Sequence, residues 1–156
     1  MHTKDGNVTV ERYRDGRLYA SNTYNNRFVK DGRTAVRDLL CGAGVYPTHL
    51  ALGTGTTLPA DTDVALEVES FRNAITRYIP YPSRARIQLY LLSDQANDTT
   101  FTEMGLFAVG REGYSQSAAG LATGGGTMLA RVSISESKTS GETMVITWDL
   151  PIQSTD

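Results

Sequence analysis

The stretch from residue 144 to residue 152 constrains the fold most, because its apolar residues recur at every second position. These residues are Met144, Ile146, Trp148, Leu150 and Ile152. Successive side chains of a β-strand point to opposite faces of its sheet, so this spacing predicts a strand with one buried face. A sheet of this kind, buried on one side and polar on the other, is typical of antiparallel folds.

Five earlier segments also predict strands, because each is a short apolar run bounded by turn-forming residues. They cover residues 48–52, 71–79, 84–92, 102–109 and 128–134. Between them we expect a loop at 58–69 with one helical turn around 64–66, a Gly/Ser-rich loop at 110–126 and a polar turn at 135–141. Strands at this spacing, with a single helix, predict a mainly β fold: an antiparallel β-sandwich or a barrel-like body.

The single helix is predicted over residues 33–41. Its apolar residues at helical spacing are Ala35, Val36, Leu39 and Leu40. Asp31 could cap its first turn, and Gly42 stands where a helix-ending glycine belongs. We therefore expect a short helix that packs its apolar face on a sheet.

Residues 1–32 predict an extended N-terminal arm, separate from a body at 33–156. The dipeptide Asp15-Gly16 between strand-like flanks is a strong signal for a β-hairpin. The hairpin has few apolar residues of its own, and an isolated two-stranded ribbon is marginal in water. We expect it to dock either on the body or on a neighbouring subunit, with the neighbour as the favoured alternative.

Composition excludes several classes of partner. The chain of 156 residues has 15 basic and 17 acidic residues, a formal net charge of −2, which does not favour duplex nucleic acid. The basic residues near the start alternate with acidic ones, which predicts a solvated surface with ion pairs. No apolar run is long enough to span a membrane, and no secretory signal is expected at the start. We expect synthesis in a cytoplasm.

No catalytic, cofactor-binding or metal-binding residues are predicted. With one cysteine and two histidines, the chain lacks the ligands of a usual zinc site. Cys41 is expected to be a buried apolar residue and His49 a half-buried strand residue. The eight tyrosines are dispersed, although Tyr78 and Tyr81 could form a contact patch.

Two segments suggest chemistry at first sight. The glycines at 53 and 55 suggest a phosphate-binding loop, but no Lys-Ser/Thr pair follows them, so we expect a tight glycine turn at a strand end. Four acidic residues between 61 and 69 suggest acid–base chemistry, but a solvated loop explains them better.

Glu103 is the most informative acidic residue, because it lies inside an apolar strand. A buried carboxylate needs partners. We expect it to bind loop N–H groups or an arginine such as Arg72 or Arg131, with a catalytic acid as the remote alternative.

An ordered series of motifs resembles a family of small structural proteins of tailed bacteriophages. The motifs lie at residues 49–72 (with Ala-Leu-Gly-Thr-Gly-Thr-Thr), 101–107 (Phe-Thr-Glu-Met-Gly-Leu-Phe), 128–132 (Met-Leu-Ala-Arg-Val), 138–140 and 146–148 (Ile-Thr-Trp). Members of this family are described as tail fibre, tail or baseplate-associated proteins. The resemblance implies a β-rich virion subunit without catalysis or cofactors, and it carries no site residues.

We therefore expect a non-enzymatic structural subunit of a virion, in the tail or baseplate, that forms a homo-oligomer and contacts other virion proteins. A capsid decoration or head–tail joining protein is one alternative. A module that binds carbohydrate on the host surface is another, and it would require aromatic residues gathered in one place.

Overall fold

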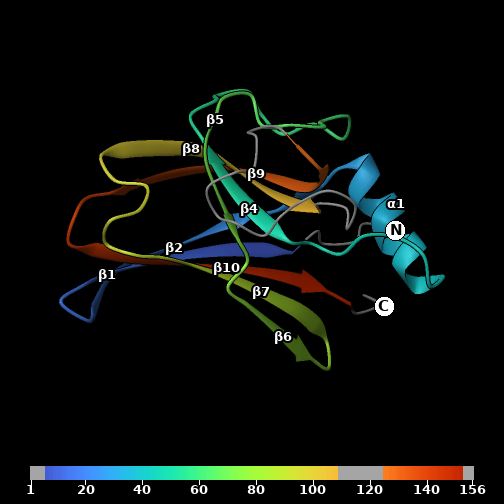
Figure 1. Cartoon of the computed structure of the whole chain (residues 1–156), viewed down its shortest axis with the longest axis horizontal. Helices are drawn as coiled ribbons and strands as arrows, with labels where there is room; N and C mark the ends of the chain where they lie inside the picture. The colour runs from blue at the N-terminus through green and yellow to red at the C-terminus, as the bar shows by residue number, and fades with distance from the viewer. Residues whose placement is uncertain (1–5, 109–124, 153–156) are drawn as a thin grey trace. The chain divides into compact units, whose positions relative to one another are not determined.

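The computed structural model describes residues 6–108 and 125–152, which form ten strands and one α-helix. The elements are β1 (Asn7–Arg14), β2 (Arg17–Asn25), β3 (Arg27–Phe28), α1 (Lys30–Leu40), β4 (His49–Gly53), β5 (Glu69–Ala74), β6 (Arg77–Tyr81), β7 (Arg84–Leu91), β8 (Thr99–Ala108), β9 (Thr127–Lys138) and β10 (Glu142–Pro151). The strands form two five-stranded sheets, ordered β2-β1-β10-β7-β6 and β3-β9-β8-β4-β5 (Figure 1). The predicted fold class, mainly β and antiparallel with one short helix, is confirmed. Over the described residues neither sheet closes into a barrel, so the sandwich-like alternative fits.

The chain divides into two compact units. Unit 1 comprises Met1–Asn26, Ile75–Thr100 and Glu136–Asp156, and it contains the whole first sheet. Unit 2 comprises Arg27–Ala74 and Phe101–Ser135, with α1 and most of the second sheet. Two strands, β8 and β9, have residues in both units.

The first sheet has one buried face, as the period-two pattern predicts. Met144, Ile146 and Trp148 are at most 1% exposed. On the neighbouring strands they are joined by Val8 and Val10 of β1 and by Ile87, Leu89 and Leu91 of β7. The pattern fails at its last position: Ile152 lies beyond β10 and is exposed.

The N-terminal hairpin is present, and it belongs to the chain's own sheet. Asp15 and Gly16 both have positive φ, the conformation that the tight turn requires. β1 pairs with β2 on one side and, over all eight of its residues, with β10 on the other. Of the two docking alternatives, the structure therefore shows the chain's own body, and the preference for a neighbour is wrong for β1.

The second sheet corrects one predicted strand. The segment 71–79 is two strands: β5 pairs with β4 in the second sheet, and β6 pairs with β7 in the first. The predicted strands at 48–52, 84–92 and 102–109 correspond to β4, β7 and β8. β9 continues to Lys138, so the polar turn after it is shorter than predicted.

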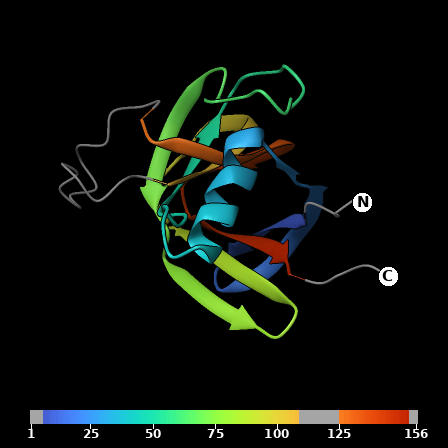
Figure 2. The ribbon, with the colours of Figure 1, turned by 90° about the vertical axis from the view of Figure 1, so that its right-hand side faces the viewer.

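The helix differs from its prediction in start, cap and packing. It begins at Lys30 after Val29, which makes no side-chain cap, so Asp31 lies in the first turn and is not the cap. Its close contact with β9 depends on Gly32, where a Cβ would collide with the Leu129 carbonyl oxygen (Figure 2). Contrary to prediction, only Ala35 of the four apolar side chains is buried: Val36, Leu39 and Leu40 are exposed, and so is Cys41.

The expected helical turn at 64–66 is absent, and the segment runs as bends into β5. Most of the Gly/Ser-rich loop at 110–126 lies outside the described residues. No helix of the described parts of the chain is long and apolar enough to cross a membrane.

Candidate functional site

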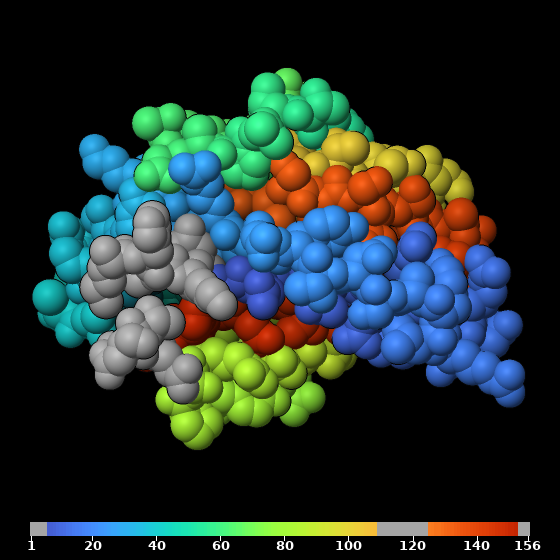
Figure 3. Space-filling view, turned by 180° about the vertical axis from the view of Figure 1, so that it is seen from behind, coloured from blue at the N-terminus to red at the C-terminus, as the bar shows by residue number. Residues whose placement is uncertain are grey.

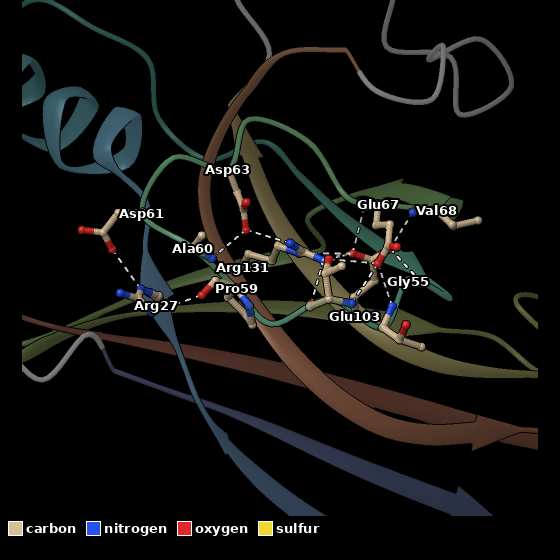
Figure 4. Close-up of polar contacts among 12 residues, drawn as sticks. Arg27, Gly55, Pro59, Ala60, Asp61, Asp63, Glu67, Val68, Glu103 and Arg131 are labelled. Atoms are coloured by element: carbon tan, nitrogen blue, oxygen red, sulfur yellow. Dashed lines mark hydrogen bonds and ion pairs between the residues drawn. The ribbon is translucent and has the colours of Figure 1, made fainter.

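The polar cluster around Glu103 is the most developed arrangement of charged side chains in unit 2 (Figure 4). Glu103 lies in β8 opposite Gly53 of β4, and its side chain is 1% exposed. Arg131 of β9 is nearly as buried, with its side chain 3% exposed. The two side chains form an ion pair, with 2.8 Å between Nη2 and Oε2. Because both groups are buried, neither charge could remain there without a partner.

The Glu103 carboxylate is fully occupied by donors. Its Oε1 accepts the backbone N–H groups of Gly55 (3.0 Å) and Val68 (2.8 Å). Its Oε2 accepts the N–H of Glu67 (3.0 Å) and two N–H groups of Arg131. Five donors fill the lone-pair positions of one carboxylate, so this group binds both ends of the loop between β4 and β5.

Arg131 extends the same network along the loop. Its Nη1 donates to Asp63 at 2.7 Å, and its Nη2 donates to the carbonyl and the hydroxyl oxygen of Thr57, both at 3.1 Å. Burial would lower the pKa of Arg131, but the hydrogen bond to Asp63 and the charge of Glu103 raise it. The guanidinium therefore stays charged and binds the loop at three points.

The Gly-Thr-Gly-Thr-Thr segment does present backbone N–H groups to an anion, but that anion is the chain's own Glu67. Its Oε2 accepts the N–H groups of Thr56 and Thr57, each at 2.8 Å, and the Thr57 hydroxyl at 2.9 Å. The Thr57 bonds lower the pKa of the Glu67 carboxyl. The segment is therefore a loop that the Glu67 carboxylate closes from within the chain.

Gly53 and Gly55 have a different role from the predicted tight turn. Neither has a positive φ. A Cβ on Gly53 would lie 2.6 Å from Glu103 Oε1, and one on Gly55 would lie 2.5 Å from the same atom. The glycines are therefore required because the backbone passes close to the buried carboxylate.

The prediction for Glu103 holds for one arginine and fails for the other. Arg131 binds it, whereas Arg72 pairs with Glu69 through two bonds of 2.6 and 2.7 Å. That second pair is also buried, and the Arg72 guanidinium lies 4.0 Å from the centroid of the Phe107 ring. A second buried ion pair in unit 2 was not foreseen.

The four acidic residues of the loop do not form one cluster: Asp63 and Glu67 both lie beside Arg131 and Thr57, whereas Glu69 pairs with Arg72. Asp61 pairs at the surface with Arg27, whereas Asp63 pairs with Arg131 (Figure 4). Asp61 also pairs with Arg33. Each oxygen that these contacts involve has a donor from the chain itself. The arrangement holds the loop in one conformation through internal ion pairs and hydrogen bonds.

Buried polar residues of unit 1 were also missed by the sequence analysis. Lys138 is fully buried, and its Nζ donates to the carbonyl oxygen of Gln95 (2.8 Å) and to Oδ1 of Asn97 (2.5 Å). Glu136 is buried two residues earlier and accepts bonds from Asn22 and Tyr24. Continuing the period-two pattern from Ile134 would have placed both on the buried face.

Three of the dispersed tyrosines lie on one face of a sheet, although only Tyr13 and Tyr90 are near each other. Tyr13, Tyr81 and Tyr90 share the outer face of the first sheet, because the strand register places them opposite the face of Ile87 and Leu89. Arg84 and Arg86 both lie over the Tyr81 ring, at 4.7 and 5.2 Å from its centroid. Tyr78, in contrast, alternates to the other side of β6.

His49 and Cys41 are the two remaining candidates, and they lie in different surroundings. His49 is half-buried in β4, as predicted, and burial followed by the charge of Arg72 lowers its pKa. Cys41 is exposed, which corrects its predicted burial. Among the described residues, no group of His, Cys, Asp and Glu side chains has the arrangement of a metal site.

Comparison with known proteins adds no relative: no protein-family model, curated protein or solved structure matches this chain.

Proposed function

We propose that this chain is a non-enzymatic structural subunit of a tailed-phage virion, in the tail or baseplate, that assembles with copies of itself and with other virion proteins. Synthesis in the host cytoplasm precedes assembly. The proposal needs no cofactor, no direct contact with nucleic acid and no membrane.

The observation that supports it best is the role of the motifs that resemble phage structural proteins. Three of them meet in one network: Gly53 and Gly55 from the first, Glu103 from the second and Arg131 from the third. The last one supplies Trp148 to the buried face of the first sheet. These residues hold loops and fill cores, so the motifs that carry the resemblance have structural roles, as a subunit without catalysis requires.

The test is the protein content of purified particles. Particles from a lysate of the strain that carries this gene should contain peptides of this chain in a fixed ratio to the major virion proteins. Separating heads from tails then distinguishes the alternatives: recovery with tails supports the tail or baseplate position, and recovery with heads supports capsid decoration or head–tail joining. Complete absence from washed particles contradicts the proposal.

A second candidate, a module that binds carbohydrate on the host surface, is favoured by Tyr13 and Tyr90, which lie near each other on the outer face of the first sheet. Aromatic rings beside guanidinium and amide groups are suited to sugar rings. A glycan array tests it with the full chain, Tyr90→Ala, and Tyr46→Ala as a control, because Tyr46 is exposed in unit 2. Binding lost only in Tyr90→Ala supports the module, and no binding by the full chain excludes it.

A further inference from the structure

Strand β2 is an open edge of the first sheet. It pairs with β1 on one side, and over the described residues no strand pairs with its other side. Figure 3 shows the blue β1–β2 hairpin on the surface of the molecule. An edge strand presents unpaired N–H and C=O groups that can bind another strand.

The other three edges are protected in ways that β2 is not. β3 has two residues, β5 carries Glu69 and Arg72, and β6 has five residues with a proline among them. Short length, charge and proline each hinder strand addition. β2 has nine residues and carries no charge after Arg17.

The backbone pattern identifies which groups of β2 are available. Asn26 N–H donates to the Gly6 carbonyl, and bonds between antiparallel strands recur at every second residue. Counted back from Asn26 in steps of two, Asn22 is a residue of β2 that bonds to β1, opposite Val10. Ser21 and Thr23, on either side of Asn22, therefore direct their N–H and C=O groups away from β1. The register shift opposite Tyr13 lies nearer the turn and leaves these two residues in a regular stretch.

We infer that the β2 edge binds the β2 edge of a second copy of this chain, antiparallel and about a two-fold axis, with Ser21 and Thr23 of each copy exchanging backbone hydrogen bonds. This deepens the self-assembly of the proposed function and rests on it for its setting in a particle. A second copy is the fitting occupant because its only long, uncharged edge among the described strands is again β2. Two-fold pairing of one strand with itself is an isologous contact, and the uncharged side chains bring no like charges together.

The interface is small. Pairing a few residues of one edge falls below the about 1,200 Å² of stable complexes. We therefore expect a dimer in solution that dissociates on dilution, and stronger association where many copies are held together in a particle.

The experiment measures mass by sedimentation over a hundred-fold range of concentration for the full chain and four variants. Ser21→Pro removes an outward N–H group, and its control Ser21→Ala keeps it. Thr23→Lys places two positive charges across the axis, and its control Thr143→Lys adds the same charge on the exposed face of the interior strand β10. Circular dichroism checks that each variant is folded.

We expect twice the chain mass at high concentration. The dissociation constant of the dimer should rise at least tenfold in Ser21→Pro and Thr23→Lys, and it should be unchanged in both controls. The Ser21 and Thr23 amides should be protected from hydrogen exchange only at high concentration. If Ser21→Pro does not fold, Thr23→Lys and the exchange data decide. A monomer at every concentration, a defined trimer, or a dimer that Thr23→Lys leaves unchanged would overturn the inference.

The same results separate this inference from the proposed function. A chain that is monomeric in solution yet present in purified particles overturns the β2 pairing alone. A β2 dimer that is absent from particles overturns the virion proposal alone.

Discussion

Glu103 shows how one residue type inside an apolar strand can predict a network. A charge removed from water needs partners, so a buried Glu103 was expected to bind loop N–H groups or an arginine. The structure shows Glu103 buried and bound to both kinds of partner. The choice between Arg72 and Arg131 could not be made in advance, because it depends on which strands become neighbours. Gly55 both donates its N–H to the Glu103 carboxylate and leaves space for it. These roles also depend on which strands become neighbours.

Replacing Glu103 with glutamine should lower the free energy of unfolding by about 3–5 kcal/mol, because Arg131 would keep its buried charge and lose one of its two carboxylate partners. Asp61→Asn is the matched control. Its ion pairs with Arg27 and Arg33 are about half exposed and screened by solvent, so the loss should be much smaller than in Glu103→Gln. Urea unfolding of both variants measures the difference. Equal losses would show that the Glu103 pair contributes no more than a surface one.

Glu142 gives the chain an acid-sensitive contact. Burial would raise its pKa, but hydrogen bonds from Tyr19, the Thr139 N–H and Arg14 outweigh it and lower the pKa to about 2. The folded pKa lies below the ordinary 4.5, so the stability from this group is complete above pH 4.5 and is lost as the pH falls towards 2.

We therefore expect Glu142→Gln to be less stable than the parent at neutral pH, by about 1–3 kcal/mol. The difference between the two proteins should shrink as the pH falls from 4.5 towards 2. Urea midpoints, followed by Trp148 fluorescence at a series of pH values, test this. Asp61 and Glu67 also have lowered pKa values, but both proteins share them. Parallel curves for the two proteins would rule out the role of Glu142.

At the scale of elements, local sequence patterns predicted which strands and turns exist better than they predicted which strands pair. The alternation over β10 and the Asp15-Gly16 hairpin were both found, because each depends on a few neighbouring residues. The segment 71–79 reads as one apolar run, yet it crosses from one sheet to the other. The exposure of Leu39 and Leu40 was unexpected because helical spacing alone does not say which neighbours a helix has.

The position of β1 between β2 and β10 makes the hairpin part of the fold. Deleting residues 1–26 would remove Val8 and Val10, each fully or almost fully buried and each worth about 1.5–3 kcal/mol. It would also leave β10 without its neighbour on one side. Because the total stability of such a chain is about 5–15 kcal/mol, we expect the truncated chain not to fold.

Circular dichroism and solubility of the truncated chain measure this outcome. Two glycines inserted after Gly16 serve as the control: they lengthen the exposed turn and leave both strands, so that variant should stay folded. A soluble, folded chain after deletion would mean that residues 1–26 form a dispensable arm after all.

At the scale of the whole molecule, the question is whether units 1 and 2 unfold together. The chain passes between them several times, and β8 and β9 are continuous strands with residues in both. If the unit 2 part of β8 or β9 lost its order, the unit 1 residues of the same strand would no longer be held in an ordered strand. We therefore expect one cooperative transition.

The chain offers a probe and a perturbation in different units. Trp148, the only tryptophan, lies in unit 1, whereas Glu103 and Arg131 lie in unit 2. Leu52 and Leu106 are buried in unit 2, and hydrogen exchange of their amides reports its unfolding. If unfolding is cooperative, Glu103→Gln should shift the urea midpoint by the same amount whether it is followed by these amides or by Trp148 fluorescence. A shift confined to the unit 2 amides would mean that the two units unfold separately, and the loop that Glu103 anchors could then open while the first sheet, with its β2 edge, stays intact.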